Sequence, residues 1–169
     1  ALAKGQPVNV DSHIYGAWVL ALADKPKTAG DTARIYLTQP KKAERLSDWG
    51  RSVLALTLYE LDERETARDQ LEVVWQRFSA QAEPVRSATW RSRAESLGML
   101  MQAALEVNPR DGRLPDLARR ILDERRGIRW ESTRDTATVL TAFARYLAET
   151  GELRPNLTAT ILVNGKQVA

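Results

Sequence analysis

Apolar residues recur at steps of three and four along this chain as far as about residue 150, and this spacing most constrains its fold. A period of this kind places apolar side chains on one face of an α-helix. The strongest examples are the segments 46–61, 63–80 and 93–107. Each segment predicts a helix that buries one face, so the sequence predicts an all-α architecture.

Glycine, proline and short polar residues divide the remaining periodic sequence into further helices. Gly127 and Gly151 follow two of them, where a glycine accepts the positive φ that often ends a helix. Asp11 or Ser12 is predicted to cap the first helix through its side-chain oxygen. The other predicted helices span residues 14–22, 31–37, 115–126 and 133–149.

Four of these helices carry similar apolar strings, spaced about 34 to 46 residues apart. Periods of this size are typical of stacked helical hairpins, arranged either in an open solenoid or in a closed ring. The strings are Val19–Leu22, Val53–Leu56, Met99–Met101 and Val139–Ala142.

The last residues of the chain follow a different pattern. Between Leu157 and Val163 apolar and polar residues alternate as in a β-strand, and Asn164-Gly165 favours a two-residue hairpin turn. The sequence therefore predicts a partial helical domain over 1–154 and the start of a β-domain over 155–169. Because an isolated hairpin is marginally stable, we expect this segment to belong to a longer polypeptide.

Composition excludes several classes of site. The 169 residues include no cysteine and one histidine, which excludes disulfides, thiol nucleophiles and Cys- or His-rich metal sites. No phosphate-binding or dinucleotide-binding motif is present, so we expect no cofactor and no metal. The 25 basic and 22 acidic residues are interleaved, which argues against nucleic-acid binding. No apolar stretch is long enough to span a membrane, and we expect no membrane contact by this segment.

No set of residues selects a catalytic site. His13 follows Asp11 and Ser12, but adjacent residues rarely form a catalytic triad, and we interpret the group as a polar helix start. A helical-barrel enzyme, such as a glycosidase or terpenoid cyclase, would need two facing carboxylates, and nothing in the sequence selects a pair. The carboxylates considered are Asp62, Glu63, Glu65, Glu95, Asp123, Glu124 and Asp135.

Five tryptophans could form a platform for stacking bases or sugars. Three of them fall on or beside apolar helix faces, so we predict packing in the core or between helices. The five are Trp18, Trp49, Trp75, Trp90 and Trp130.

The most distinctive string runs from Trp130 to Ala137 and predicts a helix start. Ser132 or Thr133 can cap the free amides, and Asp135 places a negative charge where the helix dipole favours it. Trp130 precedes the cap and can pack against the first turn.

This string resembles the end of the thioester domain of bacterial α2-macroglobulins. The resemblance rests on Arg125-Arg126-Gly127, on Trp130-x-Ser132-Thr133-x-Asp135-Thr136, on the helix ending Arg145-Tyr146-Leu147, and on the strand leading to Asn164-Gly165-Lys166. The segments Leu46–Leu61 and Trp90–Pro109 also resemble helices of that family and occur in the family's order.

The resemblance implies an α/α toroid of antiparallel helical hairpins, followed by a β-sandwich domain. It also implies a periplasmic or cell-envelope protein that inhibits endopeptidases without being an enzyme. In that family a protease cleaves a bait region and is trapped, and many members then capture it through a Cys–Gln thioester. This chain has no cysteine, so the thioester is absent from these residues. Its expected partners are target proteases and neighbouring domains of the same polypeptide.

Two other hypotheses remain open from the residues alone. A tetratricopeptide-like scaffold of helical hairpins that binds other proteins would explain the repeated strings. The helical-barrel enzyme is the third. Under the family resemblance the string Trp130, Ser132, Thr133, Asp135 and Thr136 is a structural helix start and not a catalytic site, and His13 receives no role.

Overall fold

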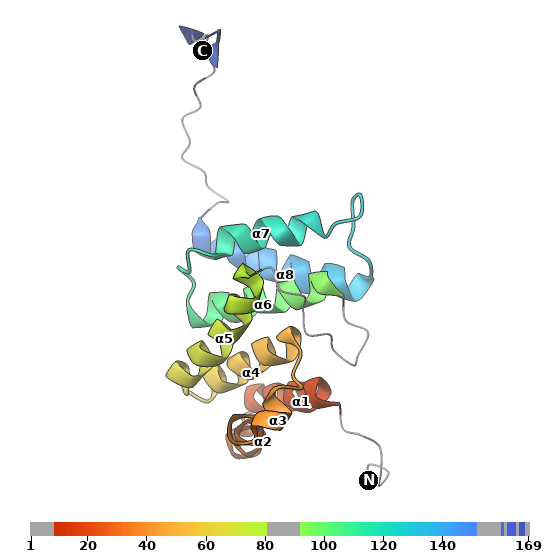
Figure 1. The fold of residues 1–169 in the computed structure, drawn as a ribbon, viewed down its shortest axis with the longest axis vertical. Helices are drawn as coiled ribbons and strands as arrows, with labels where there is room; N and C mark the ends of the chain where they lie inside the picture. The colour runs from red at the N-terminus through yellow and green to blue at the C-terminus, as the bar shows by residue number, and fades with distance from the viewer. Residues whose placement is uncertain (1–8, 81–91, 152–159, 161, 165, 168–169) are drawn as a thin grey trace.

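The computed structural model of the chain describes residues 9–80, 92–151, 160, 162–164 and 166–167. Within these residues it contains eight α-helices and two strands of two residues each, which confirms the predicted all-α architecture (Figure 1). The helices are α1 Val10–Leu22, α2 Pro26–Thr38, α3 Pro40–Ala43, α4 Asp48–Glu60, α5 Arg64–Ser79, α6 Arg93–Val107, α7 Leu114–Asp123 and α8 Thr133–Thr150; the strands are β1 Leu162–Val163 and β2 Lys166–Gln167.

The helices form two layers. Helices α1, α4, α6 and α8 pack side by side in that order, and we call them the row helices. Helices α2, α5 and α7 each pack on the row helix that precedes them in the chain, and we call them the outer helices. In Figure 1 the helices lie one above another along the long axis of the molecule, from α2 and α3 at one end to α7 at the other. The four repeated apolar strings therefore all lie on row helices.

Each row helix and the outer helix that follows it run antiparallel. The Tyr36 hydroxyl near the end of α2 donates to the Val10 carbonyl at the start of α1. Arg77 near the end of α5 pairs with Asp48 at the start of α4, with 2.7 Å between nitrogen and oxygen. Arg93 and Glu124 connect the start of α6 to the end of α7 in the same way. The chain is thus a succession of antiparallel helical hairpins.

Successive row helices run parallel, because contacts join their equivalent ends. Arg134 pairs with Glu95 at the starts of α8 and α6, at 2.9 Å. Arg145 pairs with Glu106 further along the same two helices, at 2.6 Å. Asp11 of α1 likewise accepts hydrogen bonds from Ser47, the N-cap of α4. Trp49 near the start of α4 and Glu95 near the start of α6 line the same pocket, so the starts of all four row helices lie at one side of the molecule.

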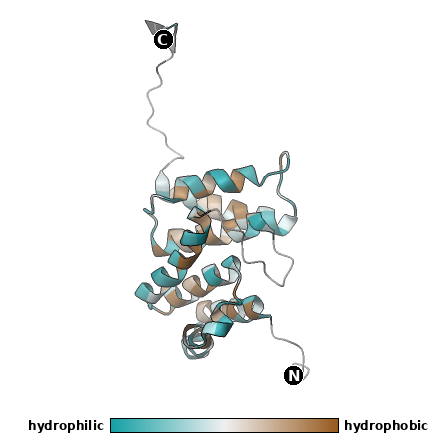
Figure 2. Ribbon diagram, in the orientation of Figure 1, coloured by the Kyte–Doolittle hydropathy of each residue, from teal (hydrophilic) through white to brown (hydrophobic). Residues whose placement is uncertain are grey.

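Helix α4 is the centre of the hydrophobic core. Its residues from Trp49 to Leu58 are all buried, because it packs against α1, α5 and α6 at once. Figure 2 colours the ribbon by hydropathy and shows hydrophobic stretches on the helices in the middle of the molecule, with hydrophilic stretches on α5 and α7. The periodic apolar faces of the sequence thus meet in one shared core.

The predicted boundaries of α6 and α8 agree with the structure, whereas the predicted start of α1 does not. The helix over 93–107 is as predicted, and α8 ends at Gly151 with φ of 72°, as predicted. The predicted N-cap of the first helix is wrong. Asn9 caps α1, and its side chain accepts from the Ser12 amide at 3.0 Å. Asp11 was unavailable for capping because its carboxylate is turned to Ser47 in the core.

Two outer helices also differ from their predictions. Helix α2 begins at Pro26, five residues before the predicted Asp31, because a proline is compatible with the first helical turn. Helix α7 ends at Asp123, so Gly127 does not terminate it. Gly127 has φ of 67° and lies instead in a tight turn closed by pairing between Arg126 and Arg129.

Most of the strand predicted over Leu157–Val163 lies outside the described residues, which omit 152–159 and 161. Among the described residues its last two positions form β1. In β1 and β2 Leu162 pairs with Gln167 and Val163 with Lys166, so the two strands are joined at the predicted turn position 164–165. The predicted β-sandwich domain over 155–169 stays a prediction.

Candidate functional site

The row helices line an open pocket with a volume of about 450 Å³. Every row helix contributes to its wall, including α1 and α8 at the two ends of the row. We call it the central pocket. Pockets of this size, with mainly apolar walls and a few polar groups, are typical binding sites for small ligands and peptide side chains. Its lining residues are Tyr15, Trp18, Trp49, Glu95, Met99, Gln102, Arg134, Ala137, Thr138 and Thr141.

One end of the central pocket is aromatic. The Tyr15 ring lies 5.9 Å from the Trp18 ring in an edge-on arrangement and 5.8 Å from the Trp49 ring. Tyr15 is 43% exposed, whereas Trp49 is buried. The Trp18 indole N–H is buried and has no hydrogen-bond partner among the described residues. This end therefore offers mainly aromatic surface.

The other end of the central pocket is polar. Glu95 is a buried carboxylate that accepts from the Nε of the more exposed Arg134 at 2.9 Å. The Gln102 amide donates to the Thr138 carbonyl at 3.2 Å, which joins α6 to α8 in the pocket wall. The ion pair compensates the burial of Glu95, because an unpaired carboxylate in such a place would be strongly unfavourable.

His13 belongs to a structural cluster at the start of α1. Its Nδ1 lies 2.9 Å from the Tyr36 hydroxyl, and that hydroxyl donates to the Val10 carbonyl at 3.2 Å. Burial raises the pKa of Tyr36 to about 12 from its ordinary value near 10. Asp11 and Ser12 do not form a triad with His13, since the Asp11 carboxylate bonds to Ser47.

The candidate carboxylates do not gather into a site. Glu95 and Asp135 are buried, and each has a structural partner, Arg134 and Ser132 respectively. Asp62, Glu65 and Asp123 are exposed on the surface, while Glu63 and Glu124 are intermediate.

The tryptophans mainly pack, as predicted. Trp49, Trp75 and Trp130 are buried, and Trp18 packs against the core. Trp90 lies outside the described residues.

The string that carries the family resemblance forms the start of α8. The Ser132 hydroxyl accepts from the Asp135 amide at 3.1 Å, and the Asp135 carboxylate accepts from the Ser132 amide at 3.1 Å, so the predicted capping box is present. Thr133 is the first helical residue and is exposed. The Thr136 hydroxyl donates to the Ser132 carbonyl. These contacts are structural.

Trp130 is buried, and its indole N–H donates to the Ile121 carbonyl of α7 at 2.9 Å. This bond ties the segment before α8 to the preceding outer helix. The sequence predicted that Trp130 packs against the first turn of α8. Its indole nitrogen instead bonds to α7.

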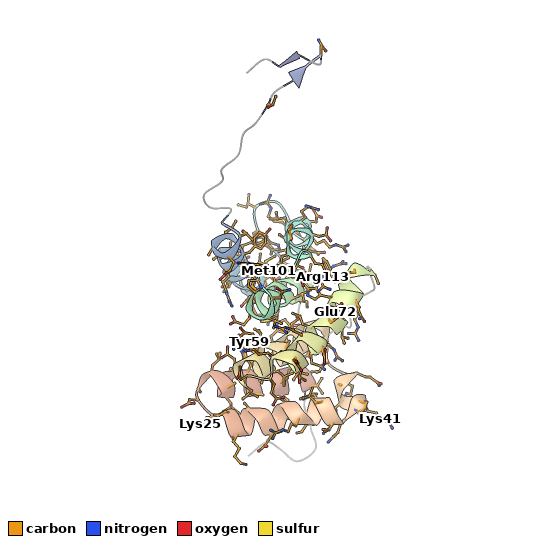
Figure 3. The ribbon with its side chains drawn as sticks, turned by 90° about the vertical axis from the view of Figure 1, so that its left-hand side faces the viewer. Lys25, Lys41, Tyr59, Glu72, Met101 and Arg113 are labelled. Atoms are coloured by element: carbon orange, nitrogen blue, oxygen red, sulfur yellow. The ribbon has the colours of Figure 1, made fainter. Side chains whose placement is uncertain are left out.

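A second hollow, of about 200 Å³, lies beside α5 and the segment before α7. Arg113 stacks on the Trp75 ring at 4.5 Å and pairs with Glu72 and Asp111 at 2.9 and 2.7 Å (Figure 3). The hydrogen bond from Arg113 holds the pKa of the Asp111 carboxyl below its usual range. Because Arg113, Glu72 and Asp111 pair with one another across this hollow, we interpret it as a structural joint.

Some classes of site have no representative in the described part of the chain. No group of three or more His, Asp or Glu side chains there could hold a metal ion. Among the described helices none is both long and apolar enough to cross a membrane.

Sequence reasoning missed the central pocket. Tyr15 and Trp18 of α1 stand three positions apart, which places both on one helix face. This spacing was the one feature of the sequence that could have indicated the pocket. Trp49, Glu95 and Arg134 come from three other segments, and only the packing of the row brings them together.

Comparisons with known proteins identify no relative. No family model, no curated protein sequence and no solved structure matches the chain.

Proposed function

We propose that this chain is part of an α2-macroglobulin-like protein of the bacterial cell envelope that traps endopeptidases. The observation that supports it most is the central pocket, because α1 and α8, at opposite ends of the row, line the same cavity. A row whose two ends line one pocket is bent and not flat. An α/α toroid requires such a bend in its inner layer, and a curved solenoid of helical hairpins shares it.

The hairpin order supports the same proposal. Row and outer helices alternate along the chain, and each hairpin is antiparallel. The family-like string beginning at Trp130 starts row helix α8, the last helix before the predicted β-domain. We therefore assign this region a structural role in a toroid, with no catalytic residue.

In such a protein this region would act as a rigid body that moves when the bait region is cut. The many interhelical pairs, such as Glu95–Arg134 and Asp48–Arg77, would keep the hairpins together during that movement. No cysteine is present to contribute to a thioester in these residues. Any covalent capture would have to use residues elsewhere in the polypeptide.

The test uses the complete gene product that contains this segment, incubated with an endopeptidase such as trypsin. A trap encloses the protease without blocking its active site. We therefore expect hydrolysis of a large protein substrate to fall, while hydrolysis of a small chromogenic peptide continues. Unchanged hydrolysis of both substrates would refute the proposal.

The same mixture, denatured and run on a gel, distinguishes two forms of trapping. A protease band shifted to higher mass indicates covalent capture, and an unshifted band with the inhibition above indicates enclosure alone. A crystal structure of the gene product tests the fold. Hairpins that open into an extended superhelix, instead of closing around an axis, would contradict the toroid.

A second candidate function is a tetratricopeptide-like scaffold that binds peptides, and the aromatic end of the central pocket favours it. Tyrosine and tryptophan dominate binding energy at many protein interfaces. Peptides selected from a displayed library on this chain should lose most of their affinity with Tyr15→Ala. They should keep it with Leu122→Ala, which alters an exposed apolar residue of α7. Selection that yields no binder, or a binder indifferent to Tyr15→Ala, would exclude this function.

A further inference from the structure

The polar end of the central pocket presents a positive charge to a ligand. Glu95 and Arg134 form an ion pair there, and their side chains are 3% and 57% exposed, respectively. The carboxylate is therefore shielded from solvent, and the charge that a ligand meets is that of the Arg134 guanidinium. The planar N–H groups of an arginine match the two oxygens of a carboxylate, which makes such pairs strong. This end of the pocket is therefore suited to a carboxylate group.

The aromatic end of the same pocket is suited to an apolar group. The exposed Tyr15 ring lies against the rings of Trp18 and Trp49, and Met99 adds a further apolar side chain to the wall. Aromatic rings arranged in this way pack well against another ring or an aliphatic chain. They would also attract a cation, but a cation in this pocket would face the like charge of Arg134. The pocket therefore favours a ligand that combines an apolar group with a carboxylate.

Neutral hydrogen-bond acceptors in the pocket wall favour a peptide as this ligand. The Gln102 amide donates to the Thr138 carbonyl, and its own oxygen accepts from none of the described residues. The Thr141 hydroxyl donates to the Ala137 carbonyl, so its oxygen can accept a further hydrogen bond. A peptide has backbone N–H groups to donate to such oxygens, whereas a fatty acid has none. A neutral sugar could donate to them, but it has no charge to pair with Arg134.

We propose that the central pocket binds the C-terminal residue of a peptide that ends in a large apolar side chain. The terminal carboxylate pairs with Arg134, the last side chain packs against Tyr15, and a backbone N–H donates to the Gln102 oxygen. A free C-terminus fits this pocket because one residue then carries both the carboxylate and the apolar group. The proposal rests on the second candidate function, peptide binding at the central pocket, and adds the chemical class of the peptide.

Fluorescence anisotropy of labelled peptides mixed with the 169-residue chain tests the proposal. The probes are Gly-Ser-Gly-Ser peptides with fluorescein at the N-terminus and phenylalanine, tryptophan or leucine as the last residue. Each is compared with the same peptide ending in a carboxamide. We expect the carboxamide to bind about 10- to 100-fold more weakly, because it loses a charge-assisted pair. A probe that ends in serine should be weaker by about the same factor, because it lacks the apolar side chain.

Two matched double variants show which ion pair produces the preference for the carboxylate. Glu95→Gln with Arg134→Gln makes the pocket neutral and leaves no buried carboxylate unpaired. Glu106→Gln with Arg145→Gln makes the same change in a second ion pair between α6 and α8, which does not line the pocket. The preference should disappear in the first variant and persist in the second. Because it is a ratio of two affinities for one protein, a general loss of stability does not imitate this result.

Equal binding of the carboxylate and carboxamide peptides by the parent chain overturns the proposal. If that binding is still lost with Tyr15→Ala, the peptide-binding function stands and only its assignment to a free C-terminus fails. Absence of binding by all three apolar probes also overturns the proposal, and the library selection described above then decides whether other peptides bind. Dodecanoate or cellobiose that competes as well as the unlabelled peptide would show that the pocket takes a fatty acid or a sugar instead.

Discussion

At the scale of single residues, Asp11 joins two row helices through one buried carboxylate. The amide and hydroxyl of Ser47 donate to it at 3.1 and 2.7 Å, and the Ser47 hydroxyl in turn accepts from the Gly50 amide at 3.0 Å. The hydrogen-bond donors at the start of α4 are therefore satisfied partly by its own N-cap, Ser47, and partly by Asp11 of α1. Removing the carboxylate would leave buried donors of Ser47 without an acceptor.

We predict that Asp11→Ala lowers the free energy of unfolding by about 1–3 kcal/mol, the usual cost of a buried unsatisfied polar group. The measurement is a urea or guanidinium titration followed by circular dichroism. Ser12→Ala is the control, because Ser12 is exposed and its backbone amide keeps its bond to Asn9. Equal effects of the two substitutions would contradict this role for Asp11.

Gly50 gives a second prediction about the same contact. A methyl group at position 50 would overlap the Asp11 carboxylate, so Gly50→Ala should destabilise the protein although alanine favours helix by about 1 kcal/mol. In the double variant with Asp11→Ala most of this overlap is removed. The combined loss of unfolding free energy should therefore be smaller than the sum of the two single losses. Strict additivity would show that the two residues do not interact.

Tyr36 makes stability depend on alkaline pH. Its pKa is raised to about 12 in the folded state, mainly by burial, and returns to about 10 on unfolding. The folded state therefore keeps the phenol proton longer, and the resulting stability is complete below pH 10 and lost as pH rises from 10 to 12. We expect the denaturation midpoint to fall less steeply over this interval in Tyr36→Phe than in the parent chain. Parallel slopes would contradict the assignment.

At the scale of helices, serine caps organise the row. Ser47, Ser92 and Ser132 each accept a backbone N–H three residues ahead, at the starts of α4, α6 and α8. Asn9 does the same for α1. Because these starts lie at one side of the molecule, the caps define that side of the row. In α8 the cap is reciprocal, since Asp135 also bonds back to the Ser132 amide.

Loss of the α8 cap should have a modest and measurable cost. Ser132→Ala removes the acceptor for the Asp135 amide, and we expect unfolding free energy to fall by about 1 kcal/mol. Thr133→Ala is the matched control, because Thr133 is exposed and does not cap the helix. Chemical denaturation of both variants provides the comparison. If Thr133→Ala lowered the unfolding free energy more than Ser132→Ala, Ser132 would not be the residue that caps α8.

The sequence predicted helices best where a cap and an apolar period agree. Helix α6 begins after Ser92, carries a continuous apolar face and has the predicted bounds. Helix α2 was predicted too short, because its buried residues include Ala29, Gly30 and Ala33, whose small side chains give little apolar periodicity. The N-cap of α1 was mistaken because four polar residues, Asn9, Asp11, Ser12 and His13, could each stand near a helix start.

At the scale of the whole molecule, the central pocket depends on the curvature of the row. Tyr15 and Thr141 line the same cavity although they are far apart in the sequence. Helical periodicity tells which face of each helix is buried, but it gives no angle between neighbouring helices. That angle follows from details such as the close approach at Gly98. The existence of stacked hairpins could therefore be predicted from the sequence, and the pocket could not.

A shared core also determines how the molecule unfolds. Helix α4 separates α1 and α2 from α6, α7 and α8, and it packs on both groups. Leu54 is fully buried in α4, and Leu54→Ala should lower unfolding free energy by about 2–5 kcal/mol. Because both groups pack against α4, we expect helix content and tryptophan fluorescence to change in one coincident transition in parent and variant. Transitions that separate in the parent chain would show that the two sides of α4 unfold independently. If the two transitions coincide in the parent chain and separate only in Leu54→Ala, then α4 is the element that couples the helices on its two sides.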